Sequence, residues 1–206
     1  MLGEDAVGAT GAAAASDEGS DGYVGSHGET WVNSRRLLLA SFAVALYGGQ
    51  MGLIAPYRGD IEDLLPVIDS WHEECNNLPF GLSMDRWCLL EHLDGARDGE
   101  FSEVLVAEDC GHPVGFMGLI VTLSELSGER ILNEHLWYVS PQFRSRRLAS
   151  DFILAAEAWG RYMGCVLFLI TASRLANQDW QRVGRMYERS GFAPFENVYM
   201  RRINGE

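Results

Sequence analysis

Three arginines lie together in a short loop whose position favours phosphate binding. The segment WYVSPQFRSRRLASDF places Arg144, Arg146 and Arg147 between an apolar run that ends at Val139 and a run with helical periodicity. The first amide groups of a helix have no partner within the helix, and the helix dipole adds partial positive charge there. Arginine side chains beside such a terminus add charged donors for a phosphate group. The segment therefore predicts a phosphate-binding loop.

Two titratable residues, Glu134 and His135, are consecutive in the apolar run that leads into this loop. Because successive strand residues point to opposite faces of a sheet, we expect one of them on each face. By the same alternation, His135 shares a face with Val139. Both are candidates for proton transfer near neutral pH, and both are equally compatible with a structural hydrogen bond.

The elements that would position these residues form a mixed α/β pattern. Local strand pairing, followed by a strand–helix–strand crossover, predicts a central mixed sheet with helices on both faces. Pro66 interrupts the first helical pattern, so that helix is expected to begin near Leu65 or to be kinked. Ser83 is the expected N-cap of the second helix, and Gly164 and Gly191 are expected to end the last two. We expect helices over residues 60–75, 83–93, 148–163 and 178–190, and strands near residue 51 and over 103–108, 113–122, 131–139, 165–172 and 195–202.

The apolar runs 131–139 and 165–172 have the length of strands and no alternation of polar residues. Such runs are typical of strands that are buried on both faces.

The composition excludes several classes of protein. Apolar residues make up 47% of the 206 residues and charged residues 22%, a balance that supports a buried core. All 16 basic residues are arginine, which excludes mechanisms that need a Schiff-base or P-loop lysine. The four cysteines form no CxxC pair, so we expect no metal site and reduced thiols, as in a cytoplasmic protein.

Charge is divided unevenly along the chain. The 29 acidic and 16 basic residues give a net charge of −13, which argues against nucleic-acid binding. Residues 60–109 hold 14 acidic residues and two arginines, whereas residues 140–202 hold ten arginines and five acidic residues. The first segment is suited to attract a cation and the second an anion, and ordinary solvated surfaces would show the same pattern.

The first 50 residues differ from the rest. Residues 1–34 contain six acidic residues, no arginine and many Gly, Ala and Ser, which predicts disorder. The apolar run from Leu37 to Tyr47 follows two arginines and has about half the length of a membrane-spanning helix. Three interpretations are open: an amphiphilic helix packed on the domain, upstream sequence ahead of a true start at Met51, or an export or membrane segment. We expect no stable membrane insertion and a folded domain over residues 51–206.

The strand and arginine loop resemble motif A of the GNAT family of N-acetyltransferases, V-x-P-x-x-R with (Q/R)-x-x-G-x-(G/A). Arg147 stands where the motif has its middle Gly, and Ser145 replaces the Gly that often follows the Arg. Glycine allows the backbone to approach a phosphate closely, whereas arginine offers a charged side chain instead. The matching residues are Val139, Pro141, Arg144 and Ala149.

A second segment, MYERSGFAPFENVYMRR, is similar to the end of the family's motif B, Y-x-x-x-G-F. Tyr187, Gly191 and Phe192 occupy its three positions, whereas Trp180 stands where the family commonly has Asn. With the order of elements, the resemblance covers roughly residues 51–203. It implies a GNAT fold.

The resemblance also implies a reaction: direct attack of a primary amine on acetyl-CoA in a ternary complex. It implies that Tyr187 protonates the departing thiolate, although a packed aromatic residue on a helix face would show the same pattern. Glu134, His135 or an ordered water would accept the ammonium proton. The residues implied to bind acetyl-CoA are Trp137, Tyr138, Val139, Arg144, Ser145, Arg146, Arg147, Leu148, Ala149 and Trp180.

The alternative is a non-catalytic GNAT-fold module that binds CoA or a protein partner. The missing motif Gly and Asn support this alternative. If the chain is an enzyme, we expect a cationic amine of a small molecule or a protein to approach the acidic segment. We expect no nucleic acid and no metal as partners, and a homodimer is compatible with the sequence.

Overall fold

The structure is a computed structural model that describes residues 54–75, 83–173, 179–196 and 198. The predictions for the N-terminal 50 residues, including the apolar run 37–47, fall outside the described residues. So does most of the strand expected over residues 195–202. Its described positions, 195, 196 and 198, adopt no strand conformation.

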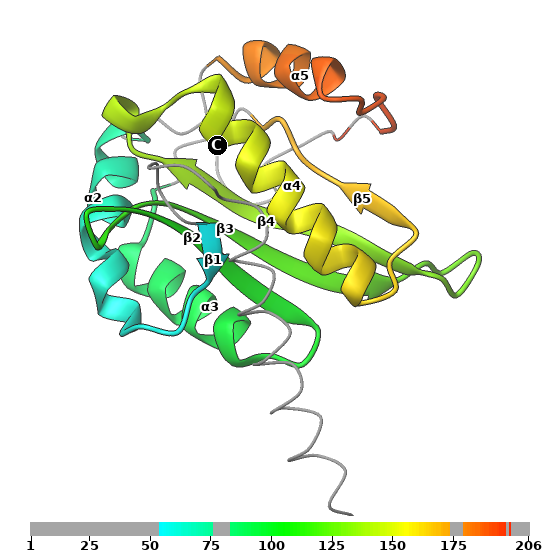
Figure 1. Cartoon of the computed structure of the whole chain (residues 1–206), viewed down its shortest axis with the longest axis horizontal. Coiled ribbons are helices and arrows are strands. Elements are labelled where there is room, and N and C mark those ends of the chain that lie inside the picture. Colours follow the sequence, from blue (N-terminus) through cyan, green and yellow to red (C-terminus); the bar gives the residue numbers. More distant parts are fainter. Residues whose placement is uncertain (1–53, 76–82, 174–178, 197, 199–206) are drawn as a thin grey trace, which may run out of the picture.

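The described chain forms a five-stranded mixed sheet in the order β1-β2-β3-β4-β5 (Figure 1). The first four strands pair antiparallel, and β5 lies parallel to β4. The elements in chain order are β1 (Ile54–Pro56), η1 (Ile61–Leu64), α2 (Leu65–Glu74), α3 (Arg86–Asp98), β2 (Ser102–Asp109), β3 (His112–Leu123), β4 (Arg130–Val139), η3 (Pro141–Phe143), α4 (Arg146–Tyr162), β5 (Leu167–Leu169) and α5 (Trp180–Arg189).

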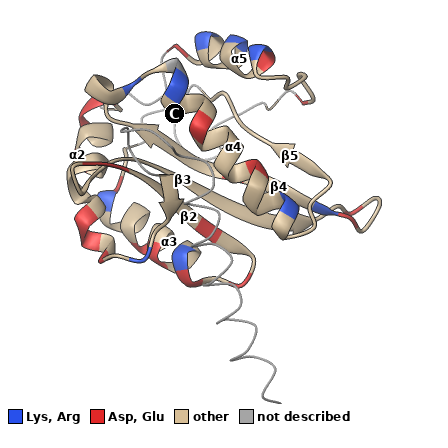
Figure 2. Ribbon diagram, viewed as in Figure 1, with Lys and Arg blue, Asp and Glu red and all other residues tan. Residues whose placement is uncertain are grey.

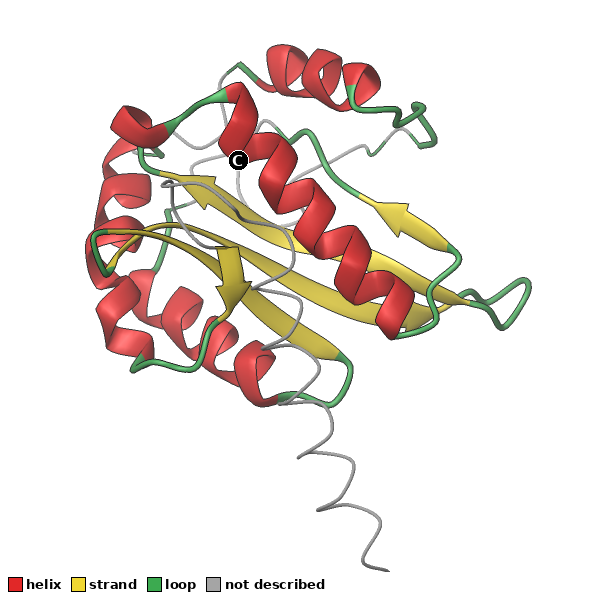
Figure 3. Ribbon diagram, viewed as in Figure 1, coloured by secondary structure: helices red, strands yellow, loops and turns green. Residues whose placement is uncertain are grey.

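Helices cover both faces of the sheet, which confirms the predicted architecture (Figure 3). Alternate residues of β2 separate the two cores, because Val104 and Val106 pack with α2 and α3 whereas Leu105 and Ala107 pack with α4. The α2/α3 core contains Leu64, Ile68, Trp71, Leu93, Phe116 and Tyr138. The α4 core contains Met117, Leu119, Leu132, Phe152, Ala156 and Trp159.

The helix boundaries follow local sequence signals, with one correction. A 3-10 turn ends at Leu64 and α2 begins at Leu65 with Pro66 in its first turn, as predicted. The N-cap of α3 is Asp85 and not Ser83, because the Asp85 carboxylate accepts hydrogen bonds from the amides of residues 87 and 88. Gly164 and Gly191 have positive φ angles of 74° and 93° directly after α4 and α5, which confirms them as helix stops.

The strand expected over residues 165–172 is shorter and more exposed than predicted. Only residues 167–169 form β5, and Val166 and Leu167 are more than half exposed. The physical reason is position, because β5 pairs with β4 alone and lies at the edge of the described sheet.

A β-bulge interrupts the pairing of β3 with β4. Gly118 lies opposite Leu136, whereas the next residue, Leu119, lies opposite Glu134. His135 is therefore an extra residue in β4 with no partner on β3. A bulge shifts the alternation of side chains by one position, so residues before and after His135 cannot be assigned to a face by simple counting.

Helix α4 packs closely on the sheet near its C-terminal end. A Cβ atom on Gly160 would lie 2.9 Å from Cδ2 of Leu132, a fully buried residue of β4. Glycine at this position allows the helix to rest directly on the strand.

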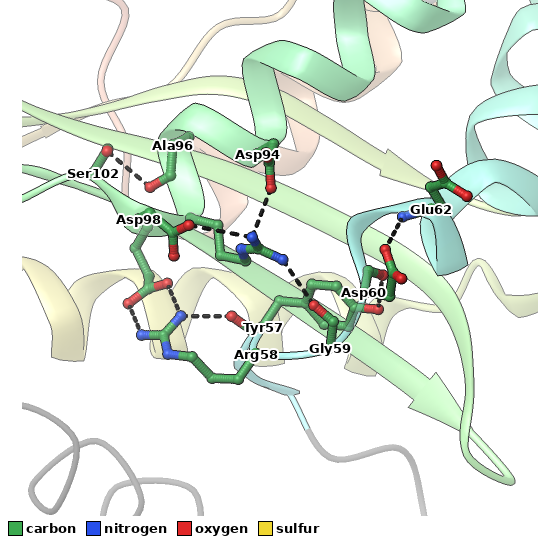
Figure 4. A network of polar contacts seen from close by, with 11 residues as sticks. Tyr57, Arg58, Gly59, Asp60, Glu62, Asp94, Ala96, Asp98 and Ser102 are labelled. Carbon is green, nitrogen blue, oxygen red and sulfur yellow. Dashed lines mark hydrogen bonds and ion pairs between the residues drawn. The ribbon is translucent and has the colours of Figure 1, made fainter.

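A polar network joins the start of the domain to α3 and β2 (Figure 4). Glu103 in β2 is fully buried, and its two oxygens accept hydrogen bonds of 2.8 and 2.7 Å from the Arg58 guanidinium. These bonds raise the pKa of Arg58. Arg97 of α3 donates to the carbonyl of Gly59 and pairs with Asp94. The network therefore ties the segment after β1 to the α2/α3 side of the sheet.

Replacing Arg58 should lower the stability of the protein more than replacing Glu103. Arg58→Met leaves the Glu103 carboxylate buried without its cation, so we expect a loss of about 2 to 3 kcal/mol in the free energy of unfolding. Glu103→Gln should cost less, because the Arg58 side chain is 43% exposed and reaches water. Urea unfolding at pH 7 measures both values. Equal losses in the two variants would contradict this account.

Candidate functional site

An opening between β4 and β5 lies at the centre of the candidate site. The two strands pair only at Ile131–Leu167, Leu132–Phe168 and Asn133–Leu169. From Glu134 to Val139, β4 continues for six residues with no partner in β5. The unpaired edge of β4 leaves backbone groups available to a ligand within a sheet that is otherwise covered on both faces.

The bulge distributes side chains around this opening. Glu134 and Trp137 face α4 and α5, whereas His135 faces α3, where its ring lies 5.8 Å from the ring of His92. Glu134 and His135 are thus on opposite faces, as predicted. The expectation that His135 shares a face with Val139 is wrong, because Val139 packs with the α4 core and the bulge reverses the alternation.

Tyr187 projects from α5 toward the opening. Its ring is buried and stacks on Trp137 with a centroid distance of 6.0 Å and an interplanar angle of 17°. Phe192, also at 6.0 Å, packs against its other side. Burial, and then the nearby Glu134 carboxylate, raise the pKa of the Tyr187 hydroxyl far above its usual range. The residue therefore has both a packing role and a hydroxyl that stays protonated.

Glu134 links the two sides of the opening. Its Oε2 accepts a hydrogen bond of 3.2 Å from the amide of Thr171, two residues beyond β5. Burial raises the pKa of the Glu134 carboxyl to about 7, although the Thr171 amide favours the charged form. A carboxyl with such a pKa exchanges protons readily at neutral pH.

The arginine loop begins where β4 ends and leads into the N-terminus of α4. Ser145 is the N-cap, and its hydroxyl accepts a hydrogen bond of 3.1 Å from the Leu148 amide. The amides of residues 146 and 147 are the first of the helix, where no preceding carbonyl of the helix can accept them. This terminus is a suitable site for an anion.

Arg144 is held by three structural contacts. Its Nε donates to the Val139 carbonyl at 2.8 Å, its NH2 group pairs with Glu74 at 2.5 Å, and its guanidinium lies 5.2 Å from the centre of the Tyr138 ring. The guanidinium therefore points toward α2. The side chain of Arg147 differs, because it is 62% exposed at the start of α4 and only loosely paired with Asp151 at 3.8 Å.

The other residues predicted to bind a cofactor occupy different environments. The Tyr138 side chain lies in the α2/α3 core, stacked on Trp71 and 3.0 Å from the Ser70 hydroxyl, so only its backbone is placed for a ligand. Trp180 is half-buried at the first position of α5. Leu148 packs against the α4 core, Ala149 is half-buried in the first turn of α4, and the structure describes only the backbone of Arg146.

Charge follows the division seen in the sequence (Figure 2). Acidic side chains are concentrated on and around α2 and α3, and basic side chains occur at the start of α4 and on α5. The opening lies between these two regions.

Three residues that contact the candidate site were not predicted from the sequence. Thr171 contributes a backbone amide, which no side-chain pattern reveals. Glu74 and His92 lie in helices that are distant in sequence from the motifs. Their helical spacing and charge give no sign of the partners that they meet across the fold.

Comparison with known proteins agrees with this geometry. Residues 100–194 match the sequence model of the acetyltransferase (GNAT) domain. The matched residues belong to a domain with the GNAT fold. Its motif-bearing strand, loop and helices all lie within the matched range. No curated protein sequence matches the chain.

Solved structures with the same fold include proteins of different specificity. The ribosomal-protein-alanine N-acetyltransferase of Brucella melitensis biovar Abortus 2308 is 19% identical, with a TM-score of 0.58 over 74% of this chain and 99% of that chain. The glucosamine-6-phosphate N-acetyltransferase of Arabidopsis thaliana is 14% identical, with a TM-score of 0.55 over 75% and 100%. An aminoglycoside 6'-N-acetyltransferase of Acinetobacter haemolyticus is 20% identical, with a TM-score of 0.53 over 74% and 99%. At these identities the similarity establishes the GNAT fold.

Two features are absent from the part of the chain that the structure describes. None of its helices has the length and apolar character to span a membrane. Among the same residues, no group of three or more His, Cys, Asp or Glu side chains is arranged to hold a metal ion.

The raised pKa of Glu134 should appear in the pH dependence of stability. The folded state binds this proton more tightly than the unfolded state, so burial of Glu134 should lower stability progressively from about pH 4.5 to about pH 7. Glu134→Gln removes this contribution, and the wild type should lose stability relative to the variant across that window. Urea unfolding of both proteins from pH 4.5 to 8 measures the difference. A difference that does not change with pH would show that Glu134 titrates normally.

Proposed function

We propose that this chain is an acetyl-CoA-dependent N-acetyltransferase that transfers an acetyl group to a primary amine in a ternary complex. The observation that supports this most directly is the opening of β4 from β5, with Glu134 and Tyr187 beside it and the N-terminus of α4 at its end. These parts combine an anion site with two groups suited to proton transfer. The proposed setting is the cytoplasm, in keeping with the four cysteines, none of which forms a disulfide in the described structure.

The chain offers a distinct contact for each part of acetyl-CoA. The helix amides at residues 146 and 147, together with the exposed Arg147 side chain, suit the pyrophosphate. The unpaired edge of β4, Trp137 to Val139, suits the amide groups of the pantetheine arm. Acetyl-CoA supplies the activated acetyl group as a thioester.

Proton transfer completes the proposed reaction. The substrate ammonium gives one proton to a base, and its nitrogen forms a bond to the acetyl carbonyl carbon. The bond from that carbon to sulfur then breaks, the nitrogen loses its second proton to solvent, and the Tyr187 hydroxyl protonates the thiolate. The base then returns its proton to the Tyr187 oxygen, directly or through solvent, so the products are the acetylated amine, CoA thiol and one released proton. The high pKa of Tyr187 keeps its proton available at every physiological pH.

Two residues are suited to the role of base. Glu134 has a carboxyl pKa of about 7 and lies near Tyr187. His135 lies on the opposite face, and burial together with His92 lowers the pKa of its imidazole, which favours the neutral form that accepts a proton. A Glu134 base would make the rate fall below about pH 7, and Glu134→Gln would abolish that limb of the pH profile. If His135 is the base, His135→Asn would abolish it instead.

The role of Tyr187 separates an enzyme from a module that only binds CoA. Tyr187→Phe keeps the stack on Trp137 and removes the hydroxyl, so single-turnover rates should fall by about 10²- to 10⁴-fold while CoA affinity and melting temperature are retained. Tyr162→Phe, which changes another partly buried tyrosine at the far end of α4, is the matched control. Full activity of Tyr187→Phe would leave Tyr187 as a packing residue.

The two arginines of the loop should respond differently to replacement. Arg147→Ala should weaken CoA binding about tenfold or more without lowering the melting temperature, because a charge-assisted bond to phosphate contributes ~1.5 to 3 kcal/mol. Arg144→Ala should also lower the melting temperature, because it breaks the contacts with Glu74 and Tyr138. Arg161→Ala, which breaks a similar i,i+4 pair at the other end of α4, is the control. Calorimetry with CoA and a thermal shift at millimolar CoA test these outcomes. No binding by the wild-type protein would refute the proposed cofactor.

A further inference from the structure

A cavity of about 310 Å³ lies between α3 and the sheet, on the face opposite Tyr187. It opens beside the bulge of β4. Its lining includes four polar residues and two glycines: Glu91, His92, Ser102, His135, Gly95 and Gly118.

Two glycines leave the space free. A Cβ atom on Gly95 of α3 would meet nothing within 4 Å, and a Cβ on Gly118 of β3 would lie 3.7 Å from Leu93 and Leu136. Glycine within a helix is unfavourable by about 1 kcal/mol relative to alanine, so Gly95 has a cost for the stability of α3. Neither glycine adds a side chain to the space between α3 and the sheet.

The cavity adjoins the acetyl-transfer site. His135 follows Glu134 directly, and these are the first residues of β4 beyond its pairing with β5. Because Glu134 faces Tyr187 and His135 faces the cavity, the opening in the sheet has the proposed acid on one side and the cavity on the other. A nucleophile in the cavity would therefore approach an acetyl group in the opening from the side opposite Tyr187.

The polar groups at the cavity suit an ammonium group. His92 and His135 meet edge to face at 5.8 Å, and a neutral imidazole nitrogen accepts a hydrogen bond from an N–H donor. The Glu91 carboxylate lines the same cavity and adds negative charge. The segment that contains α3, residues 60–109, has 14 acidic residues against two arginines, and the negative charge that is left after Glu74, Asp94 and Glu103 pair with arginines raises the local concentration of cations. The remaining lining, which includes Leu93 and Ala96, is apolar.

We infer that this cavity is the acceptor site, and that it takes a small free primary amine with a single ammonium group on a compact apolar body. The inference rests on the proposed acetyl transfer and adds the class of acceptor. Small-molecule sites span roughly 300 to 1,000 Å³, so a cavity of about 310 Å³ is at the lower limit. Only a compact amine lies entirely within this volume, because the cavity is open to solvent beside the exposed residues Glu91, His92 and His135. The apolar walls also disfavour a second charge on the acceptor.

The test has two parts: a comparison of four acceptors, and a substitution, Gly95→Leu, whose side chain fills the cavity. The acceptors are phenethylamine, spermidine, an aminoglycoside and a peptide with a free N-terminus, each assayed for CoA thiol release. We expect the wild-type kcat/KM for phenethylamine to exceed that for the other three at least tenfold. Gly95→Leu should raise KM for phenethylamine at least tenfold and leave acetyl-CoA affinity unchanged. Cys88→Leu, which adds the same side chain at an exposed position of α3 outside the cavity, should change neither value.

A second readout does not depend on turnover. With CoA present, phenethylamine should shift the NMR signals of the His92 and His135 rings, and Gly95→Leu should abolish the shift. If Gly95→Leu does not fold, His92→Phe keeps the ring contact, removes the nitrogens and should raise KM or the binding constant at least tenfold. Preference for the peptide or the aminoglycoside, or histidine signals that the amine leaves unchanged, would overturn the inference. Failure of the proposed function itself would be seen separately, as absence of CoA binding or of thiol release with every amine.

Discussion

One extra residue in a strand determines most of the arrangement described above. Because His135 has no partner on β3, the side chains of β4 change faces at that point, and Glu134 comes to share a face with Trp137 and Tyr187. The same irregularity coincides with the end of the pairing between β4 and β5. A regular strand would have placed both titratable residues in positions set by alternation alone. The bulge thus sets the placement of these groups, and it lies next to the point where β4 stops pairing with β5.

The arginine loop shows how a departure from a family pattern is accommodated. Arg147 stands where the motif has a glycine, yet it lies at the exposed first turn of α4 and adds a cation there that is only loosely paired with Asp151. Arg144, which matches the motif, is instead held by Glu74, Tyr138 and the Val139 carbonyl. The loop is therefore fixed from the α2 side of the sheet, while the charge that we propose for phosphate binding is supplied by Arg147 in the helix itself. Arg147 thus offers the exposed charge, and Arg144 holds the loop in place.

The sequence predicts the sheet, its two helical layers and the position of the arginine loop, because each depends on local signals such as periodicity, capping and glycine stops. It predicts Glu134, His135 and Tyr187 as the titratable groups of the site. It misplaces the face of Val139 relative to His135, because a bulge depends on pairing with β3 and leaves no mark in β4 itself. It overestimates β5 for a similar reason, since an apolar run does not show where its neighbouring strand diverges. The contacts of Glu74, His92 and Thr171 join segments far apart in the chain, and only the folded structure brings them together.

The close packing at Gly160 affects the position of the whole of α4. The helix has 17 residues and is about 25 Å long, and the contact with Leu132 lies near its C-terminal end, whereas the amides that we propose to bind an anion are at the other end. Because α4 is rigid, a shift of tenths of an ångström at the contact between Gly160 and Leu132 would rotate the whole helix about its other contacts and move its N-terminal end. The alignment of the helix terminus with the opening of β4 is therefore determined partly by a residue that no ligand would touch. A side chain at residue 160 would have to displace Cδ2 of Leu132, so the position of the helix depends on how far the Leu132 side chain can move.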